Sequence, residues 1–153
     1  MSYRTLQRTL VRLLHDPSLV ERMSREGAPA LNEPDLTTQE FAWLSAVDPR
    51  AFLTDPYRQG RVLTSLVEEL PTASILASGR LQGGLNSFFA SESFHLAVQE
   101  ERALRLSFAD HLGRTGEDVR ALADIEVALM TARRAVEIEK AELTPALGVL
   151  WRT

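Results

Sequence analysis

The stretch DVRALADIEVALMTARRA, residues 118–135, predicts a long helix around which the rest of the chain is organised. At about 100° per residue, one arc of this helix is apolar and the opposite arc is polar, as in a helix that buries one side. The apolar arc consists of Ala121, Leu122, Ile125, Leu129, Ala132 and Val136. We expect this arc to face the core of the protein.

Two charged residues, Glu126 and Arg133, fall beside the apolar arc of the same helix. A buried charge without a partner costs free energy, so both side chains need partners. A catalytic interpretation would make Glu126 an acid and Arg133 the residue that orients it. Buried ion pairs that tie helices together are commoner, and we therefore expect structural ion pairing at Glu126 and Arg133.

The length of 153 residues is typical of one compact domain, able to bury a core without metal or disulfide links. We expect a single helical domain, residues 1–153, with amino-terminal helices in 1–77, carboxyl-terminal helices in 78–140 and a tail in 141–153. Hydrophobic residues make up 44% of the chain and charged residues 25%, which excludes a disordered chain. Because there is no cysteine, a disulfide framework, a thiolate zinc site and a cysteine nucleophile are also excluded.

The charge and hydropathy of the chain limit its partners. The net charge of −4 provides no positive field for nucleic acid, whose phosphates favour basic surfaces. No run approaches the roughly 20 apolar residues that a membrane span requires. The amino terminus is amphipathic and lacks the continuous apolar stretch of a signal peptide. We therefore expect a cytoplasmic protein that does not bind membranes, and the charge disfavours nucleic acid as a partner.

Helix-start signals recur along the chain. Asp16, Asp48 and Asp55 each precede a proline, which combines an N-cap side chain with a residue suited to the first helical position. Thr37 and Glu40 have the spacing of a capping box. With the apolar periodicity, these signals predict helical segments at residues 3–14, 17–26, 38–46, 50–53, 56–70, 85–89, 96–112 and 118–140, with Pro71 ending or kinking the fifth.

The predicted fold is therefore mainly α, a compact bundle of about seven helices. The tail AELTPALGVLWRT, residues 141–153, is interpreted as a short strand and turn or as a loose end. Its apolar residues Leu147, Leu150 and Trp151 would either close the core or form a surface for a partner, and the sequence leaves both open.

Glu92 and His95 have the spacing of the Glu-x-x-His motif, by which di-iron helical bundles bind metal. A di-iron site needs this motif twice, and neither His15 nor His111 has a carboxylate three residues earlier. We interpret Glu92 and His95 as a surface pair at a helix start. No catalytic residue, metal site or cofactor is predicted in this chain, and we expect it not to be an enzyme by itself.

Four segments of the chain occur in an order found in a known helical family. They are residues 6–17 (LQRTLVRLLHDP), Arg61 followed by 70–72 (LPT), residues 104–112 (LRLSFADHL) and residues 122–129 (LADIEVAL). This order resembles accessory proteins that carry the description of a DNA-binding domain and are encoded beside multinuclear non-haem iron oxidases. The chain departs from the family at Ile125 and Val127, where leucine and tryptophan are typical.

The resemblance implies a non-catalytic subunit. Such proteins pair with an iron oxidase of TIM-barrel type and help to bind the leader of a ribosomally made precursor peptide, as in methanobactin and 3-thiaglutamate biosynthesis. The iron would then belong to the partner subunit. In such relatives the carboxyl-terminal part contacts the leader by adding it to a sheet edge. The residues that we accordingly assign to partner or peptide contact are Arg133, Arg134, Leu147, Leu150 and Trp151.

Two other functions remain open at the level of sequence. A helical module that binds some other protein is the main alternative. A DNA-binding regulator ranks third, because no helix combines basic and amide side chains with the short glycine-containing turn of a helix-turn-helix.

Overall fold

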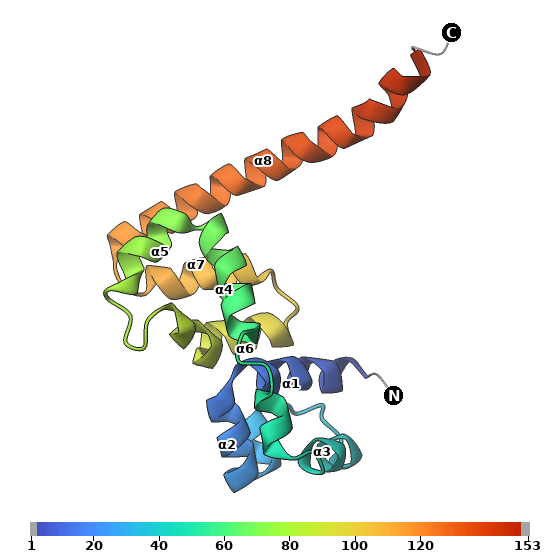
Figure 1. Ribbon diagram of the computed structural model, residues 1–153, viewed down its shortest axis with the longest axis vertical. Helices are drawn as coiled ribbons and strands as arrows, with labels where there is room; N and C mark the ends of the chain where they lie inside the picture. The colour runs from blue at the N-terminus through green and yellow to red at the C-terminus, as the bar shows by residue number, and fades with distance from the viewer. Residues whose placement is uncertain (1–2, 151–153) are drawn as a thin grey trace.

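A computed structural model describes the backbone of residues 3–150 and the side chains of residues 3–136. This part of the chain contains helices and no strand, which confirms the mainly α fold class (Figure 1). The α-helices are α1 (Arg4–His15), α2 (Pro17–Glu26), α3 (Thr38–Ser45), α4 (Arg58–Glu69), α5 (Pro71–Ser78), α6 (Glu92–Gln99), α7 (Leu104–Gly113) and α8 (Glu117–Leu150). Three 3-10 helices join them: η1 (Ala28–Leu31), η2 (Pro49–Leu53) and η3 (Leu85–Ala90).

Most of the predicted helix starts are confirmed by their capping hydrogen bonds. The Asp16 carboxylate accepts from the backbone N–H of Ser18 at 2.9 Å at the start of α2. Thr37 and Glu40 form a complete capping box at the start of α3. Asp48 caps η2 in the same way. Asp55 accepts from the N–H of Tyr57 at 3.0 Å, but α4 itself begins at Arg58, two residues later than predicted.

The single helix predicted over residues 96–112 is wrong. Helix α6 ends at Gln99, and α7 begins at Leu104. Between them, Glu101 adopts the left-handed conformation with φ 56°, and the N–H of Arg102 donates back to the carbonyl oxygen of Ala97 at 2.8 Å. A left-handed residue usually ends a helix at glycine, and no glycine or proline occurs here to signal the break.

The carboxyl-terminal region also differs from its prediction. Helix α8 runs for 34 residues to Leu150, so a strand or loose end over residues 141–150 is wrong. Its carboxyl-terminal half projects away from the other helices (Figure 1). Trp151 lies outside the described residues. Among the helices that the structure describes, none combines the length and the apolar character needed to cross a lipid bilayer.

The buried residues form two separate hydrophobic clusters. The first is built by α1, α2, α3, η1 and η2, and it includes Leu13, Leu19 and Phe52. The second is built by α4 to α8 with η3, and its centre is the aromatic group of Phe88, Phe89, Phe94 and Phe108. We call the boundary between them the seam. In Figure 1, α2 and α3 lie below α1, and α5, α7 and α8 lie above α6.

Helix α8 buries a different side from the one its periodicity predicts. Val119 and Ala123 are buried, whereas Ile125 is 56% exposed and Leu129 is 54% exposed. The expectation that the apolar arc faces the core is therefore wrong. Helix α8 instead packs on α5 and α7 through the side that carries Glu126. On that side the Glu126 carboxylate accepts hydrogen bonds from the start of α5.

Candidate functional site

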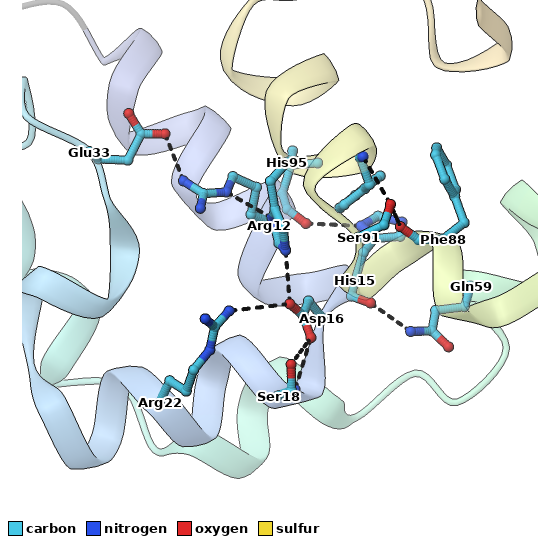
Figure 2. A network of polar contacts seen from close by, with 12 residues as sticks. Arg12, His15, Asp16, Ser18, Arg22, Glu33, Gln59, Phe88, Ser91 and His95 are labelled. Carbon is cyan, nitrogen blue, oxygen red and sulfur yellow. Dashed lines mark hydrogen bonds and ion pairs between the residues drawn. The ribbon is translucent and has the colours of Figure 1, made fainter. Parts of the chain in front are cut away.

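A chain of polar contacts crosses the seam between α1, α2 and α6 (Figure 2). The Arg12 guanidinium donates to the Glu33 carboxylate at 2.9 Å and, through Nε, to Nδ1 of His95 at 3.0 Å. On the other side of the ring, Nε2 of His95 lies 2.9 Å from Oδ2 of Asp16. The other carboxylate oxygen of Asp16 accepts from the backbone and the hydroxyl of Ser18. Five side chains from distant parts of the sequence thus form one network.

The seam network is almost inaccessible to water. The side chains of Arg12 and Glu33 are each 4% exposed, and that of Asp16 is 1% exposed. Burial lowers the pKa of Arg12, although the nearby Glu33 and Asp16 oppose this shift. Burial raises the pKa of Asp16, but hydrogen bonds from His95 and Ser18 outweigh it, so the net shift of this pKa is downward. Arg12 and Glu33 therefore form a buried ion pair, and hydrogen bonds from His95 and Ser18 stabilise the charge of Asp16.

His95 has no free ring nitrogen for acid–base chemistry. Because Nδ1 accepts from Arg12, the ring proton is on Nε2 and is donated to Asp16. A general base needs one nitrogen free to take a proton from substrate. The expectation that Glu92 and His95 form a surface pair is wrong for His95, whose side chain is only 12% exposed. Ser91 caps α6 instead.

A second histidine lies beside a serine, and the hydrogen bonds of this pair also argue for a structural role. Oγ of Ser87 is 3.3 Å from Nε2 of His111 and donates its own proton to the carbonyl oxygen of Gly84 at 2.7 Å. Oγ therefore accepts from His111 and does not give its proton to the ring. Within residues 3–136, no three histidine or carboxylate side chains gather in a way that would hold a metal ion.

Glu126 ties α8 to α5 by capping the shorter helix. Its carboxylate oxygens accept from the backbone N–H of Thr72 at 2.8 Å and of Ala73 at 3.1 Å. These are free N–H groups in the first turn of α5, whose own N-cap residue Leu70 provides no side-chain bond. Among the described side chains no ion pair joins Glu126 to Arg133. Glu126 thus links two helices, as expected, but its partners are backbone N–H groups and not an arginine. A local sequence pattern cannot show that a carboxylate will bind the backbone of a distant helix.

The structure brings three of the predicted site residues to one cavity. Glu126, Arg133 and Arg134 line a space of about 270 Å³ between the end of α4, the start of α5 and α8. Arg134 forms an ion pair with Glu69 on α4, and Arg133 is exposed. Leu147, Leu150 and Trp151, assigned to the same partner or peptide contact, lie outside the described side chains.

A larger groove lies between α4 and the start of α7, and its volume is about 510 Å³. Its apolar lining comes from Val62, Leu66 and Leu104, and Arg61 and Arg105 stand beside them. Nε of Arg105 is buried and has no hydrogen-bond partner among the residues that the structure describes. No pattern in the sequence predicted this groove. Arg61 and Leu104 nevertheless belong to two of the segments that carry the family resemblance.

Comparison with known proteins identifies no relative. No family model matches the chain, and neither a curated protein nor a solved structure matches it. The family resemblance of the four segments therefore remains a prediction.

Proposed function

We propose that this chain is a non-catalytic accessory subunit that pairs with a multinuclear non-haem iron oxidase and helps to bind the leader of a ribosomally made precursor peptide. The oxidase would hold the iron and carry out the chemistry. The proposal combines the resemblance of the four segments with the groove between α4 and α7. That groove is the single observation that favours peptide binding over the alternative of an unspecified helical interaction module.

The lining of the α4/α7 groove suits a peptide that is apolar on one side and acidic on the other. Val62, Leu66 and Leu104 provide contact area for apolar side chains, whose burial contributes roughly 25 cal/mol per Å². Arg61 already pairs with Asp55. Arg105 forms no ion pair with any described side chain, and its partly exposed guanidinium would gain a charged hydrogen bond from a carboxylate of the leader. Arg105 is therefore the proposed anchor for an acidic residue of the leader.

The seam network supports the non-catalytic part of the proposal. Both ring nitrogens of His95 are hydrogen-bonded, one to Arg12 and the other to Asp16, and these bonds hold α6 against α1. A subunit of this kind acts by positioning its partner and the peptide relative to each other, which contributes to rate without supplying a reacting group.

Co-expression with the iron oxidase encoded beside this protein tests the proposal. We expect the two proteins to elute together as a 1:1 complex on size exclusion and the complex to bind the leader peptide in fluorescence anisotropy. Arg105→Glu should weaken leader binding about tenfold or more, because a charged hydrogen bond contributes about 1.5–3 kcal/mol. The control Arg50→Glu makes the same charge change at an exposed site on η2 and should leave binding within about twofold.

Two results would overturn parts of this proposal separately. Independent elution of the two proteins would reject the oxidase partnership. An intact complex whose leader affinity is the same for wild type, Arg105→Glu and Arg50→Glu would reject the groove as the peptide site.

A further inference from the structure

Two hollows of the surface share one side chain, Glu69 at the end of α4. Glu69 is the last α4 residue that lines the α4/α7 groove of about 510 Å³, and it also lines the cavity of about 270 Å³ beside α8. Arg134 of α8 forms its ion pair with this same carboxylate, so α4 and α8 meet where the two hollows adjoin. We call the groove and the cavity together the extended groove.

Both parts of the extended groove offer apolar contact area. Leu66 and Leu104 belong to the lining of the groove, and Pro71 and Met130 belong to that of the cavity. The charge that lies between the two parts is the Glu69 carboxylate, and its ion pair with α8 neutralises it. An apolar segment can therefore lie across the junction without facing a charge that lacks a partner.

Arginine side chains stand in both parts of the extended groove. Arg105 lines the groove, and Arg133, which is exposed, lines the cavity. Two carboxylates of the cavity are already engaged: Glu69 pairs with Arg134, and Glu126 accepts from backbone N–H groups of α5. A ligand that complements this pattern is apolar in its middle and acidic toward both ends.

The length of the extended groove suits a short extended peptide. The α4 residues of its lining run from Arg61 to Glu69, which is about 12 Å at 1.5 Å per residue. Packed helices lie about 8–10 Å apart, and this is the further distance from α4 to α8. An extended chain advances about 3.3 Å per residue, so about six or seven residues span the two distances together.

We propose that one extended segment of the leader peptide occupies both hollows, with one acidic residue at Arg105 and a second, about six or seven residues away, at Arg133. This inference rests on the proposed function, to which it adds a second anchor on α8 and the spacing of the two acids. Because the described residues contain no strand, side chains hold the peptide, and it is not added to a sheet edge.

Fluorescence anisotropy of the labelled leader with the oxidase complex measures the second anchor. We expect Arg133→Glu to weaken binding about two- to fivefold, the range for an exposed charge pair. Glu68→Gln removes an exposed carboxylate from the same cavity and should tighten binding up to about twofold. The control Arg120→Glu makes the same charge change at an exposed position of α8 that lines neither hollow, and it should leave the affinity unchanged.

The outcomes separate this inference from the proposed function, provided that size exclusion shows each variant complex to be intact. Weaker binding for Arg105→Glu, together with equal affinities for Arg133→Glu and Arg120→Glu, would overturn the second anchor and leave the α4/α7 groove as the peptide site. Absence of leader binding by the wild-type complex would overturn both.

Disulfide trapping tests whether one peptide spans both hollows, and the chain has no cysteine of its own to interfere. Ser65→Cys places a thiol in the groove, and Met130→Cys places one in the cavity. Synthetic leaders with a single cysteine at successive positions are incubated with each variant complex under mild oxidation. We expect the leader positions that the two variants trap to lie about six or seven residues apart. Trapping by Ser65→Cys alone, or trapping of the same leader position by both variants, would overturn the proposal.

Discussion

The seam network and the junction between α5 and α8 both tie helices together through charged side chains, but they differ in exposure to water. Arg12 and Glu33 at the seam are each 4% exposed. At the junction, Arg80 lies two residues after α5 and pairs with Asp118 of α8, and these two side chains are 39% and 55% exposed. A buried charge interacts strongly with its partner, and leaving it unpaired is equally costly. An exposed pair can exchange its partner for water. Similar contacts therefore differ in their effect on stability according to how deeply they are buried.

The largest expected effect comes from breaking the seam network. Arg12→Met leaves the Glu33 carboxylate buried without its cation and frees Nδ1 of His95. We expect the free energy of unfolding to fall by about 3–5 kcal/mol, the usual result of removing one partner from a buried pair. Urea denaturation with circular dichroism measures this loss.

A matched control and a double variant make the Arg12 prediction decisive. Arg80→Met removes the exposed arginine of the Arg80–Asp118 pair and should leave the urea midpoint nearly unchanged. Adding Glu33→Gln to Arg12→Met should recover part of the stability, because the unpaired charge is then removed. Equal losses for Arg12→Met and Arg80→Met would show that burial does not distinguish the two junctions.

A smaller effect is expected at the junction itself. Glu126→Gln retains one acceptor for the start of α5 but places an amide N–H₂ where a carboxylate oxygen accepted. We expect a loss of about 1 kcal/mol, as for a weakened helix cap, and a fall in melting temperature of about 2–4 °C. Glu68→Gln changes an exposed carboxylate on the same cavity and serves as the control. A melting temperature of Glu126→Gln equal to that of Glu68→Gln would exclude the capping role.

The smallest expected effect is the pH dependence of the seam. The ring of His15 stacks on Phe89 across the seam, and burial lowers its pKa from the ordinary value of 6.5. The folded protein therefore favours the neutral ring, while the unfolded chain takes up the proton first as pH falls. This contribution to stability is present above pH 6.5 and is lost as pH falls through the lowered pKa.

Thermal unfolding at pH 7.5 and pH 5.5 measures the effect. We expect wild type to lose stability on acidification and His15→Phe to lose less, since phenylalanine retains the stacking without a titrating group. His111, whose pKa is also lowered by burial and by Arg114, maintains part of the dependence in the variant. If His15→Phe showed the same pH dependence of stability as wild type, His15 would not contribute to it.

Local signals in the sequence predicted the helices well where the side chain that starts a helix is adjacent to it. Asp16, Thr37 and Asp48 cap the elements that follow them, and Pro71 separates α4 from α5. The break between α6 and α7 gave no such signal, because Glu101 takes a left-handed conformation that glycine usually provides.

The relations between helices could not be predicted from periodicity. The periodicity of α8 predicted an apolar arc, but periodicity alone does not determine which other helices pack on that arc. In the structure the arc around Ile125 and Leu129 is exposed. His95 and Asp16 are 79 positions apart, and Glu126 and Thr72 are 54 apart. Such contacts depend on how the helices pack. The sequence therefore singled out Glu126 as needing a partner and could not say which groups the partner would be.

The length of α8 also has a mechanical consequence. A helix of 34 residues spans about 51 Å at 1.5 Å per residue, and its base is held by the contacts around Val119 and Glu126. If the whole helix tilts by about 10° about its first turn, its far end moves by roughly 9 Å, given that length. A displacement at the Glu126 cap too small to disturb the core would thus be magnified at the far end, and α8 would act as a lever that converts small changes in the body into large changes of position.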